Sequence, residues 1–324
     1  MLRVMTWNIR TGGRDRTGPD RRDLVCRVVA AQAPDVLAVQ ELRGFDRPGV
    51  LAGFADRVGM RAHLARSCFG QPVAVLVRPP WPTRSAGPVR RPFHHAVQRV
   101  ELGTTAGPLT VLSAHLDPYT GLRRRIEAGW LVGAVRRAPG ELALLAGDLN
   151  TLDPGTDHTD RVARLPAAYR RRHLRRDGRT VDTRAVARLL AAGLVDLWTH
   201  AAGPPAPTDT PAPTDTPGWG DAAVPTDAAG WGEAADPTNA AGPTDTAGWG
   251  GAAASGEAGL TAPTRYGGGG EFSGMRLDYL FGSPALAARL RAVRVVRGGD
   301  AEYASDHYPV VAELDLALAP MGES

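Results

Sequence analysis

Short apolar runs recur along the chain, and glycine, proline or polar residues bound most of them. Runs of this length, rich in valine, leucine and alanine, are typical of buried strands. A Gly107-Pro108 pair between two runs indicates a hairpin turn. We therefore predict ten strands, over residues 2–7, 36–40, 61–65, 73–77, 97–102, 109–114, 142–146, 277–281, 292–296 and 310–314.

Longer segments with helical periodicity are fewer than the strands. The helices that this periodicity predicts cover residues 21–32, 51–58, 122–135 and 183–192. In the third, Leu122, Ile126, Trp130 and Val135 share roughly one face, which we expect to be buried. Many strands with few intervening helices favour two stacked sheets flanked by helices over a regular βαβ repeat.

Residues 206–253 differ in kind from the rest, because they divide into eight related six-residue units. Proline, glycine and aspartate are frequent and aliphatic residues are nearly absent, so burial cannot offset the entropy lost on ordering. We predict a single domain over residues 1–324, interrupted by a disordered insertion at about 203–262. The alternative is that Trp219, Trp231 and Trp249 bind a partner or stack on bases.

Charge is unevenly distributed over the 324 residues, 43% of which are hydrophobic. All 38 basic residues are arginine, and the net charge is +4. The repeat segment carries seven acidic residues and no basic one, so the remainder of the chain carries +11. A basic body suits a phosphate-bearing substrate, although arginine serves solubility equally well.

Two cysteines, Cys26 and Cys68, are too few for a disulfide framework, and reduced thiols are the default in the cytosol. We see neither a secretory signal nor an apolar run of about 18 residues. We therefore expect a cytoplasmic protein with no membrane span and no obligate protein partner.

Polar side chains stand at the ends of the predicted strands. Rigid strand ends are where catalytic side chains collect, so we expect these residues to form one metal-centred pocket. They are Asn8, Glu41, His115, Asp148, Asn150, Asp278, Asp306 and His307.

The residue types in this set suit the hydrolysis of a phosphoester bond with the help of a metal ion. Such a reaction needs charge neutralisation at the phosphoryl oxygens, an activated water and help for the leaving oxygen. Mg²⁺ prefers oxygen ligands, so Glu41 is the first candidate, with Asn8 and Asp306 as further ligands.

The histidines and the remaining acids suit proton transfer. We expect His307 to accept a proton from water and Asp278 to hold its tautomer. His115 would donate to a phosphoryl oxygen, and Asp148 would orient the nucleophile or assist the leaving group, with Asn150 beside it. Each residue taken singly also fits a turn, a strand cap or a surface loop, but their shared placement at strand ends favours a site.

The motifs TWN, QE, HLD, GDLN, RLDYLF and SDHYPV, in this order from Asn8 to Pro309, resemble the endonuclease/exonuclease/phosphatase superfamily. The resemblance implies an α/β (α+β) fold, a four-layer α/β/β/α sandwich of two mixed sheets flanked by helices. It implies a metal-dependent phosphoester hydrolase, which we expect to be a nuclease-type phosphodiesterase. The alternatives are a phosphatase or phosphodiesterase for a small molecule or lipid head group and, less favoured, a non-catalytic binding module.

The same resemblance assigns the site. It implies Mg²⁺ or Mn²⁺ at Glu41 with Asn8 and Asp306 nearby, a pair of His307 with Asp278, and His115, Asp148 and Asn150 around the scissile phosphate. Leu149 stands where many members have phenylalanine, which concerns packing.

Three features lie outside these motifs. Asp153, Asp157, His158 and Asp160 fit either a second metal site or, as we prefer, a solvated loop. Residues 161–179 contain eight arginines that would clamp phosphates or form a solvated amphipathic helix. His94-His95 and His200 have no motif around them, and we interpret them as structural.

Overall fold

Twelve strands form two six-stranded sheets in the computed structural model, which describes residues 1–203, 257–267 and 269–319. The strand orders are β11-β12-β1-β2-β4-β3 and β5-β6-β7-β8-β10-β9. The strands are β1 (Leu2–Asn8), β2 (Val36–Gln40), β3 (Arg61–Ala65), β4 (Val73–Val77), β5 (Thr83–Pro88), β6 (Ala96–Thr104), β7 (Gly107–His115), β8 (Leu142–Asp148), β9 (Val195–Asp196), β10 (Asp278–Gly282), β11 (Leu290–Val295) and β12 (Val310–Leu314).

Each sheet is mixed, because the β1–β2 and β7–β8 pairs are parallel while the other pairs are antiparallel. The helices are α1 (Arg22–Gln32), α2 (Val50–Val58), α3 (Gly121–Val135), α4 (Thr159–Ala163), α5 (Ala167–Arg170), α6 (Arg184–Ala191), α7 (Leu197–Ala202), α8 (Pro284–Ala287) and α9 (Ala301–Ala304), with 3-10 turns η1 (Thr11–Gly13), η2 (Arg171–His173) and η3 (Gly269–Glu271). All ten predicted strands and all four predicted helices are present, and β5, β9 and the short helices are additional.

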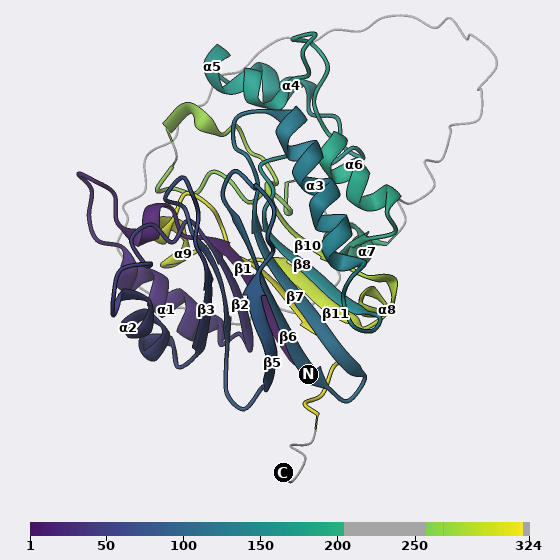
Figure 1. Cartoon of the computed structure of the whole chain (residues 1–324). Coiled ribbons are helices and arrows are strands. Elements are labelled where there is room, and N and C mark those ends of the chain that lie inside the picture. The colour runs from purple at the N-terminus through teal and green to yellow at the C-terminus, as the bar shows by residue number, and fades with distance from the viewer. Residues whose placement is uncertain (204–256, 268, 320–324) are drawn as a thin grey trace, which may run out of the picture. The chain divides into compact units, whose positions relative to one another are not determined.

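Alternating side chains of each strand divide the core into layers. Val4 and Val36 of one sheet face Val111 and Leu144 of the other in the central layer. Met5 and Leu37 point the opposite way, toward α1, α2 and α9. The outer face of the second sheet packs on α3 and α6, and Figure 1 shows α1 and α2 on the opposite outer side from α3 and α6. The four-layer α/β/β/α prediction is confirmed.

Two local predictions were wrong. The hairpin between β6 and β7 turns at Thr105-Ala106, while Gly107-Pro108 already belongs to β7. Leu122 and Ile126 of α3 are 40% and 41% exposed. The inner face of α3 instead carries the fully buried polar residues Arg124 and Glu127 with Ala128 and Leu131.

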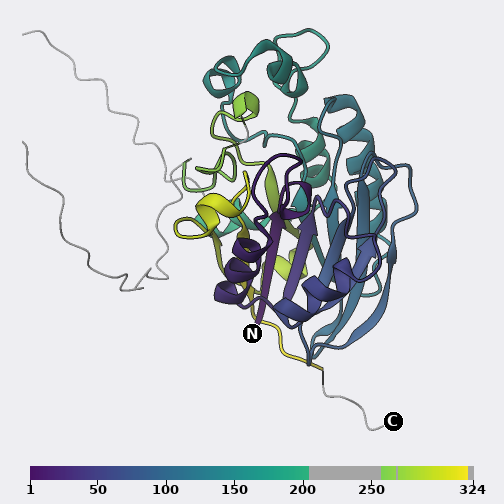
Figure 2. The same ribbon diagram turned by 90° about the vertical axis from the view of Figure 1, so that its left-hand side faces the viewer.

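Strand direction brings the predicted site residues to one edge. β1, β2, β7 and β8 end at this edge, whereas β12 and β10 begin there, because each runs antiparallel to a central strand. Thr6 pairs with Val310, and Asp148 pairs with Asp278. Figure 2 shows β1 running from the N-terminus to the end of the sheets where α4 and α5 lie.

The predicted insertion at about 203–262 lies largely outside the described residues, as do the three tryptophans within it. Its last predicted residues are described, and Thr261 and Ala262 are buried there. Within the described ranges, no helix combines the length and apolar character needed to cross a membrane. Cys26 is buried and Cys68 is exposed, and both are free thiols.

Candidate functional site

A cleft of about 510 Å³ opens at the strand edge. Its volume lies in the range of small-molecule and cofactor sites. It contains six of the eight predicted site residues, namely Glu41, His115, Asp148, Asn150, Asp306 and His307. Asn8 and Asp278 lie directly behind them, because both hydrogen-bond to residues of the lining. The structure therefore places the eight residues together at one strand edge.

His307 is held by a buried carboxylate. Its Nδ1 lies 2.7 Å from Oδ2 of Asp278, and its Nε2 lies 4.0 Å from Oδ2 of Asp148. All three side chains are buried, and the backbone oxygen of His307 accepts a hydrogen bond from Trp7 Nε1 at 2.8 Å. A histidine fixed in this way keeps one tautomer and presents Nε2 to the cleft.

Asn8 connects two carboxylates at the end of β1. Its Nδ2 donates to Glu41 Oε1 at 3.1 Å and to Asp148 Oδ2 at 3.0 Å, while its Oδ1 accepts from the Arg10 backbone at 3.0 Å. The other oxygen of Glu41 accepts from Gln71 Nε2 and from the Thr11 backbone, both at 2.9 Å. The network fixes Glu41 at the cleft.

The backbone around these residues is strained. Arg10, Thr11, Glu41 and Asn150 adopt positive φ angles of 49°, 50°, 61° and 50°. Non-glycine residues rarely occupy this region, and such strain concentrates at functional sites. Four of the five such residues in the described ranges are therefore at this one edge, and the fifth, Ala33, caps α1.

The other predicted residues complete the lining. Asp306 Oδ2 pairs with Arg10 at 3.0 Å. Asn150 donates from its backbone to Asp148 Oδ1 at 2.8 Å and from Nδ2 to Leu116 O at 3.1 Å. Nε2 of His115 lies 3.6 Å from Asp148 Oδ2, and its buried Nδ1 has no hydrogen-bond partner in the part of the chain that the structure describes.

Burial of several acids together sets the charge of the site. Burial raises the pKa of Asp148 to about 7, although the charge on His307 lowers it and the Asp278 carboxylate adds a smaller rise. Burial raises the pKa of Asp306 to about 6, and the Glu41 carboxylate contributes to the rise. Both acids therefore keep their protons to higher pH than exposed carboxyls do, and a bound cation would favour their ionised forms.

The histidines respond in opposite directions. Burial lowers the pKa of His307, but the carboxylates of Asp278 and Asp148 outweigh it and hold that pKa well above its usual range. Burial lowers the pKa of His115 to about 3, with help from the charge on His307. His115 is thus neutral, and its ring nitrogens can donate and accept hydrogen bonds.

The donor set fits a divalent cation. Asp148, Asp278 and His307 have ligand atoms within 4.8 Å of one another, the one such group among the described residues. Buried carboxylates, whose negative charge is costly without a counter-ion, are the kind of ligand that a hard cation stabilises. The cluster can therefore bind a divalent metal.

His94 and His95, which the sequence interpretation left as structural, line the cleft. The ring of His95 stacks on that of His115 at 4.1 Å between centroids. The pairing of β6 with β7 could have indicated this position. Ala96 pairs with His115, so the histidines directly before Ala96 lie at the same edge as His115. Arg43 and Gln71 also line the cleft without a sequence motif that marks them.

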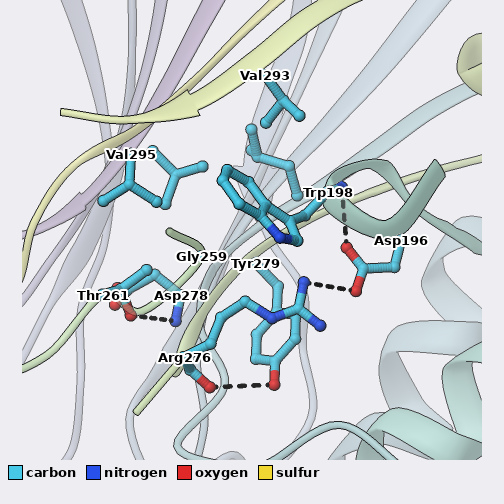
Figure 3. A pocket seen from close by; sticks show the side chains of 11 residues that line it. Asp196, Trp198, Gly259, Thr261, Arg276, Asp278, Tyr279, Val293 and Val295 are labelled. Carbon is cyan, nitrogen blue, oxygen red and sulfur yellow. Dashed lines mark hydrogen bonds and ion pairs between the residues drawn. The ribbon is translucent and has the colours of Figure 1, made fainter. Parts of the chain in front are cut away.

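The loop after Asn150 is not a solvated loop throughout, which corrects our preference. Asp153 and His158 are 7% and 3% exposed. Asp153 pairs with Arg276 at 3.5 Å, and Arg276 also pairs with Asp196 at 2.7 Å. Figure 3 shows Arg276 between Asp196 and Tyr279, beside a cavity of about 10 Å³ that has room for one water at most. The acids there serve as partners of a buried arginine.

A two-sheet sandwich with a buried His–Asp pair and clustered carboxylates at one strand edge defines a class of phosphoester-cleaving hydrolases. The family model described as "Endonuclease/Exonuclease/phosphatase family" matches residues 5–307, so the chain belongs to this family. Members are metal-dependent phosphoesterases, among them nucleases and phosphatases, and the chain is an enzyme of this type. No curated protein sequence gives a significant match.

Solved structures share the fold. An AP endonuclease from Archaeoglobus fulgidus matches with a TM-score of 0.60 and 17% identity, over 97% of this chain and 100% of that chain. The 3′ phosphatase NExo from Neisseria, bound to a product DNA hairpin, matches at 0.58 and 18% over 97% and 100%. A humanized TDP2 of D. rerio matches at 0.57 and 16% over 96% and 97%. At these identities the likeness concerns the fold.

Proposed function

We propose that this protein hydrolyses phosphodiester bonds in nucleic acid with a divalent cation, Mg²⁺ or Mn²⁺, at Glu41. The observation that carries the proposal is the convergence of an acid-rich, histidine-lined cleft with an arginine-rich segment at its rim. Asp306 and Asn8 would complete the cation site. This placement leaves the 2.7 Å bond between His307 and Asp278 intact.

The protein's own groups have separate tasks. A neutral His307 accepts a proton from the attacking water at Nε2, and Asp278 stabilises the imidazolium that forms. The positive charge of a cation bound nearby would oppose the raised pKa of His307 and so favour its neutral form. His115, which lines the cleft and whose Nε2 lies 3.6 Å from Asp148 Oδ2, would donate a hydrogen bond to a phosphoryl oxygen. Asp148 orients the water or assists the leaving oxygen, with Asn150 beside it. When bound, the cation supplies positive charge that stabilises the developing charge on the phosphoryl oxygens.

Charge favours a polyanionic substrate. The segment with eight arginines forms the short elements α4, α5 and η2, so the alternative of one amphipathic helix is wrong. Arg172 and His173 of this segment line the cleft. Five arginines of the segment are exposed, and they are Arg164, Arg171, Arg175, Arg176 and Arg179. Arginine is well suited to phosphate, so this segment would contact the backbone of a bound strand.

A substrate screen tests the proposal. The full chain, with Mg²⁺, Mn²⁺ or EDTA, is assayed on DNA and RNA strands, duplex DNA, inositol phosphates and a chromogenic phosphodiester. We expect metal-dependent cleavage of nucleic acid, with an affinity that falls steeply as salt rises. Hydrolysis confined to inositol phosphates, with weak salt dependence, would contradict the proposal and favour the small-molecule alternative.

A pair of variants tests the metal assignment. We expect Glu41→Gln to lower turnover by about 10²-fold or more and to raise the Mg²⁺ concentration needed for activity. Glu271→Gln is the matched control, because Glu271 also lines the cleft but pairs with Arg172 at 3.2 Å. The control should keep the wild-type metal requirement. Equal metal requirements in both variants would contradict the placement at Glu41.

A further inference from the structure

Two exposed aromatic rings at the cleft contact the ring of His94. Phe69 is 60% exposed and Tyr119 is 55% exposed, and both line the cleft. The ring of Phe69 stacks on His94 at 4.4 Å between centroids and 7° between planes, and Tyr119 meets His94 edge-on at 5.4 Å. Aromatic surface left in water at a cleft indicates a place where a ligand covers it. We call Phe69, His94 and Tyr119 the aromatic shelf.

The aromatic shelf is held in place by Asp117. Its Oδ2 lies 3.1 Å from His94 Nδ1, and its Oδ1 accepts from the backbone N–H groups of Tyr119 and Thr120 at 2.8 and 2.6 Å. One buried carboxylate therefore fixes both the central ring and the backbone of the second. A ligand would meet a preorganised surface and lose less entropy on binding.

The aromatic shelf reaches the reacting groups through a chain of rings. Successive centroid distances are 4.4 Å from Phe69 to His94, 4.5 Å from His94 to His95 and 4.1 Å from His95 to His115. A flat group on Phe69 would therefore belong to a unit of the substrate close to the phosphate at His115.

Positive charge lies beside the same rings. The Arg172 guanidinium stands 5.4 Å from the ring centroid of Tyr119, and Arg43 also lines the cleft. A ligand that offers a flat ring and an anion a short distance apart matches this combination. Nucleotides have both, whereas inositol phosphates have no flat ring to stack.

We propose that the aromatic shelf binds the face of an unpaired nucleobase near the scissile phosphate, so that the substrate is single-stranded or has an extruded base. This inference rests on the proposed function. A base inside a duplex has both faces covered by its neighbours, and must leave the stack before it can reach a protein ring. Stacking on an aromatic side chain is tolerant of sequence, because every base has a flat face.

Steady-state kinetics on a ten-nucleotide strand, as DNA and as RNA, test the proposal. We expect Phe69→Ala to raise KM about fivefold or more with kcat within about twofold. Phe69→Trp should restore the wild-type KM because it restores a ring. Tyr303→Ala is the matched control, since Tyr303 is 50% exposed but does not line the cleft, and its KM should not change.

A substrate change separates stacking from general packing. A set of DNA strands is prepared, each with an abasic analogue at a different position. The wild-type protein should bind one of them more weakly, namely the strand whose analogue lies next to the cut. At that position Phe69→Ala should cause no further loss, because the two changes remove the same contact. In a His307→Ala background, which keeps the strand intact, 2-aminopurine at that position should be quenched on binding, and Phe69→Ala should abolish the quenching.

The outcomes distinguish this inference from the proposed function. Two results would overturn the base-binding role of the aromatic shelf and leave the proposed function standing. One is cleavage of a strand with the same KM by the wild type and by Phe69→Ala. The other is an equal KM for a strand and a fully paired duplex. Absence of cleavage of DNA and RNA with both metals would overturn the proposed function and the shelf together. Wild-type melting temperatures for Phe69→Ala and Tyr303→Ala exclude misfolding as the cause of any change.

Discussion

Single residues at the strand edge do their work through a few short contacts. Asp278 illustrates this, because its Oδ2 is the 2.7 Å partner of His307, while its carboxylate is wholly buried and holds the histidine pKa up. An aspartate in this position orients the imidazole and stabilises its charged form. Its identity as an acid therefore matters more than its size.

We expect Asp278→Asn to lower kcat by about 10²- to 10⁴-fold, because an amide favours the wrong tautomer and carries no charge to stabilise the imidazolium. KM should change little. The measurement is single-turnover hydrolysis with saturating metal, next to Asp46→Asn, an exposed acid that does not line the cleft. A kcat within threefold of wild type would rule out the His307–Asp278 pair as the base.

Strands hold these residues in register, and β7 and β8 lie in close contact at Gly147, directly before the site residue Asp148. Gly147 pairs with Ala114 across the two parallel strands and has a φ of 148°. A Cβ built there would lie 1.9 Å from the Ala114 carbonyl oxygen. Only glycine fits, and it stands directly before Asp148.

We expect Gly147→Ala to lower the free energy of unfolding by about 2 to 3 kcal/mol or more and to displace Asp148, so that activity falls as well. Gly53→Ala is the control, since Gly53 lies in α2 with open space around the added methyl. The control should be neutral or stabilising by about 0.5 to 1 kcal/mol. Urea unfolding of both variants measures this, and equal stabilities would refute the packing argument.

The buried Asp153 joins the loop after β8 to the start of β10 and makes stability depend on pH. Burial raises its pKa, but the His158 hydrogen bond and the Arg276 charge outweigh this and hold the pKa well below its usual range. A lowered carboxyl pKa contributes stability above the unfolded value, near 4, and loses it as pH falls.

We therefore expect Asp153→Asn to destabilise the fold by about 1 to 3 kcal/mol at pH 7. The difference from wild type should shrink as the pH falls below about 4, toward the lowered folded-state pKa, because the wild-type carboxylate then takes up a proton. Urea midpoints at pH 7 and pH 3.5 measure it. A difference that is constant with pH would mean that the charge of Asp153 contributes nothing.

At the scale of the whole molecule, the hexad repeat lies in the chain between α7 and β10. The described segments before and after the repeat contact each other. Trp198 precedes the repeat and Gly259 follows it, and a Cβ built at Gly259 would lie 2.6 Å from Trp198 Nε1. Figure 3 shows the two residues together. The described chain before and after the repeat is thus anchored without it. The excess positive charge belongs to the rest of the chain, because the charged residues of the repeat are all acidic.

We expect replacement of residues 206–253 by a short Gly-Ser linker to leave kcat and KM within about twofold. The free energy of unfolding should be unchanged or higher by about 1 kcal/mol, because a shorter loop costs less entropy to close. Thermal unfolding and strand cleavage measure both. A lower melting temperature would show that the repeat contributes to the folded domain.

The sequence by itself determined the elements and the chemistry of their ends. Apolar runs and turn residues are local signals, so β2, β3, β4 and β12 begin and end where they were predicted. A polar residue at a strand end is also local, which is why Glu41 and Asp148 could be named without coordinates.

Only the tertiary structure decided which of these residues touch. The contacts of Asn8 with Glu41 and Asp148, the buried Arg124 and Glu127 of α3, and the stack of Phe69 on His94 all join segments that are separate in the chain. These contacts are set by strand register and by packing between layers, and both depend on all the strands at once. A local pattern holds no such information, and so it pointed α3 the wrong way and passed over His94.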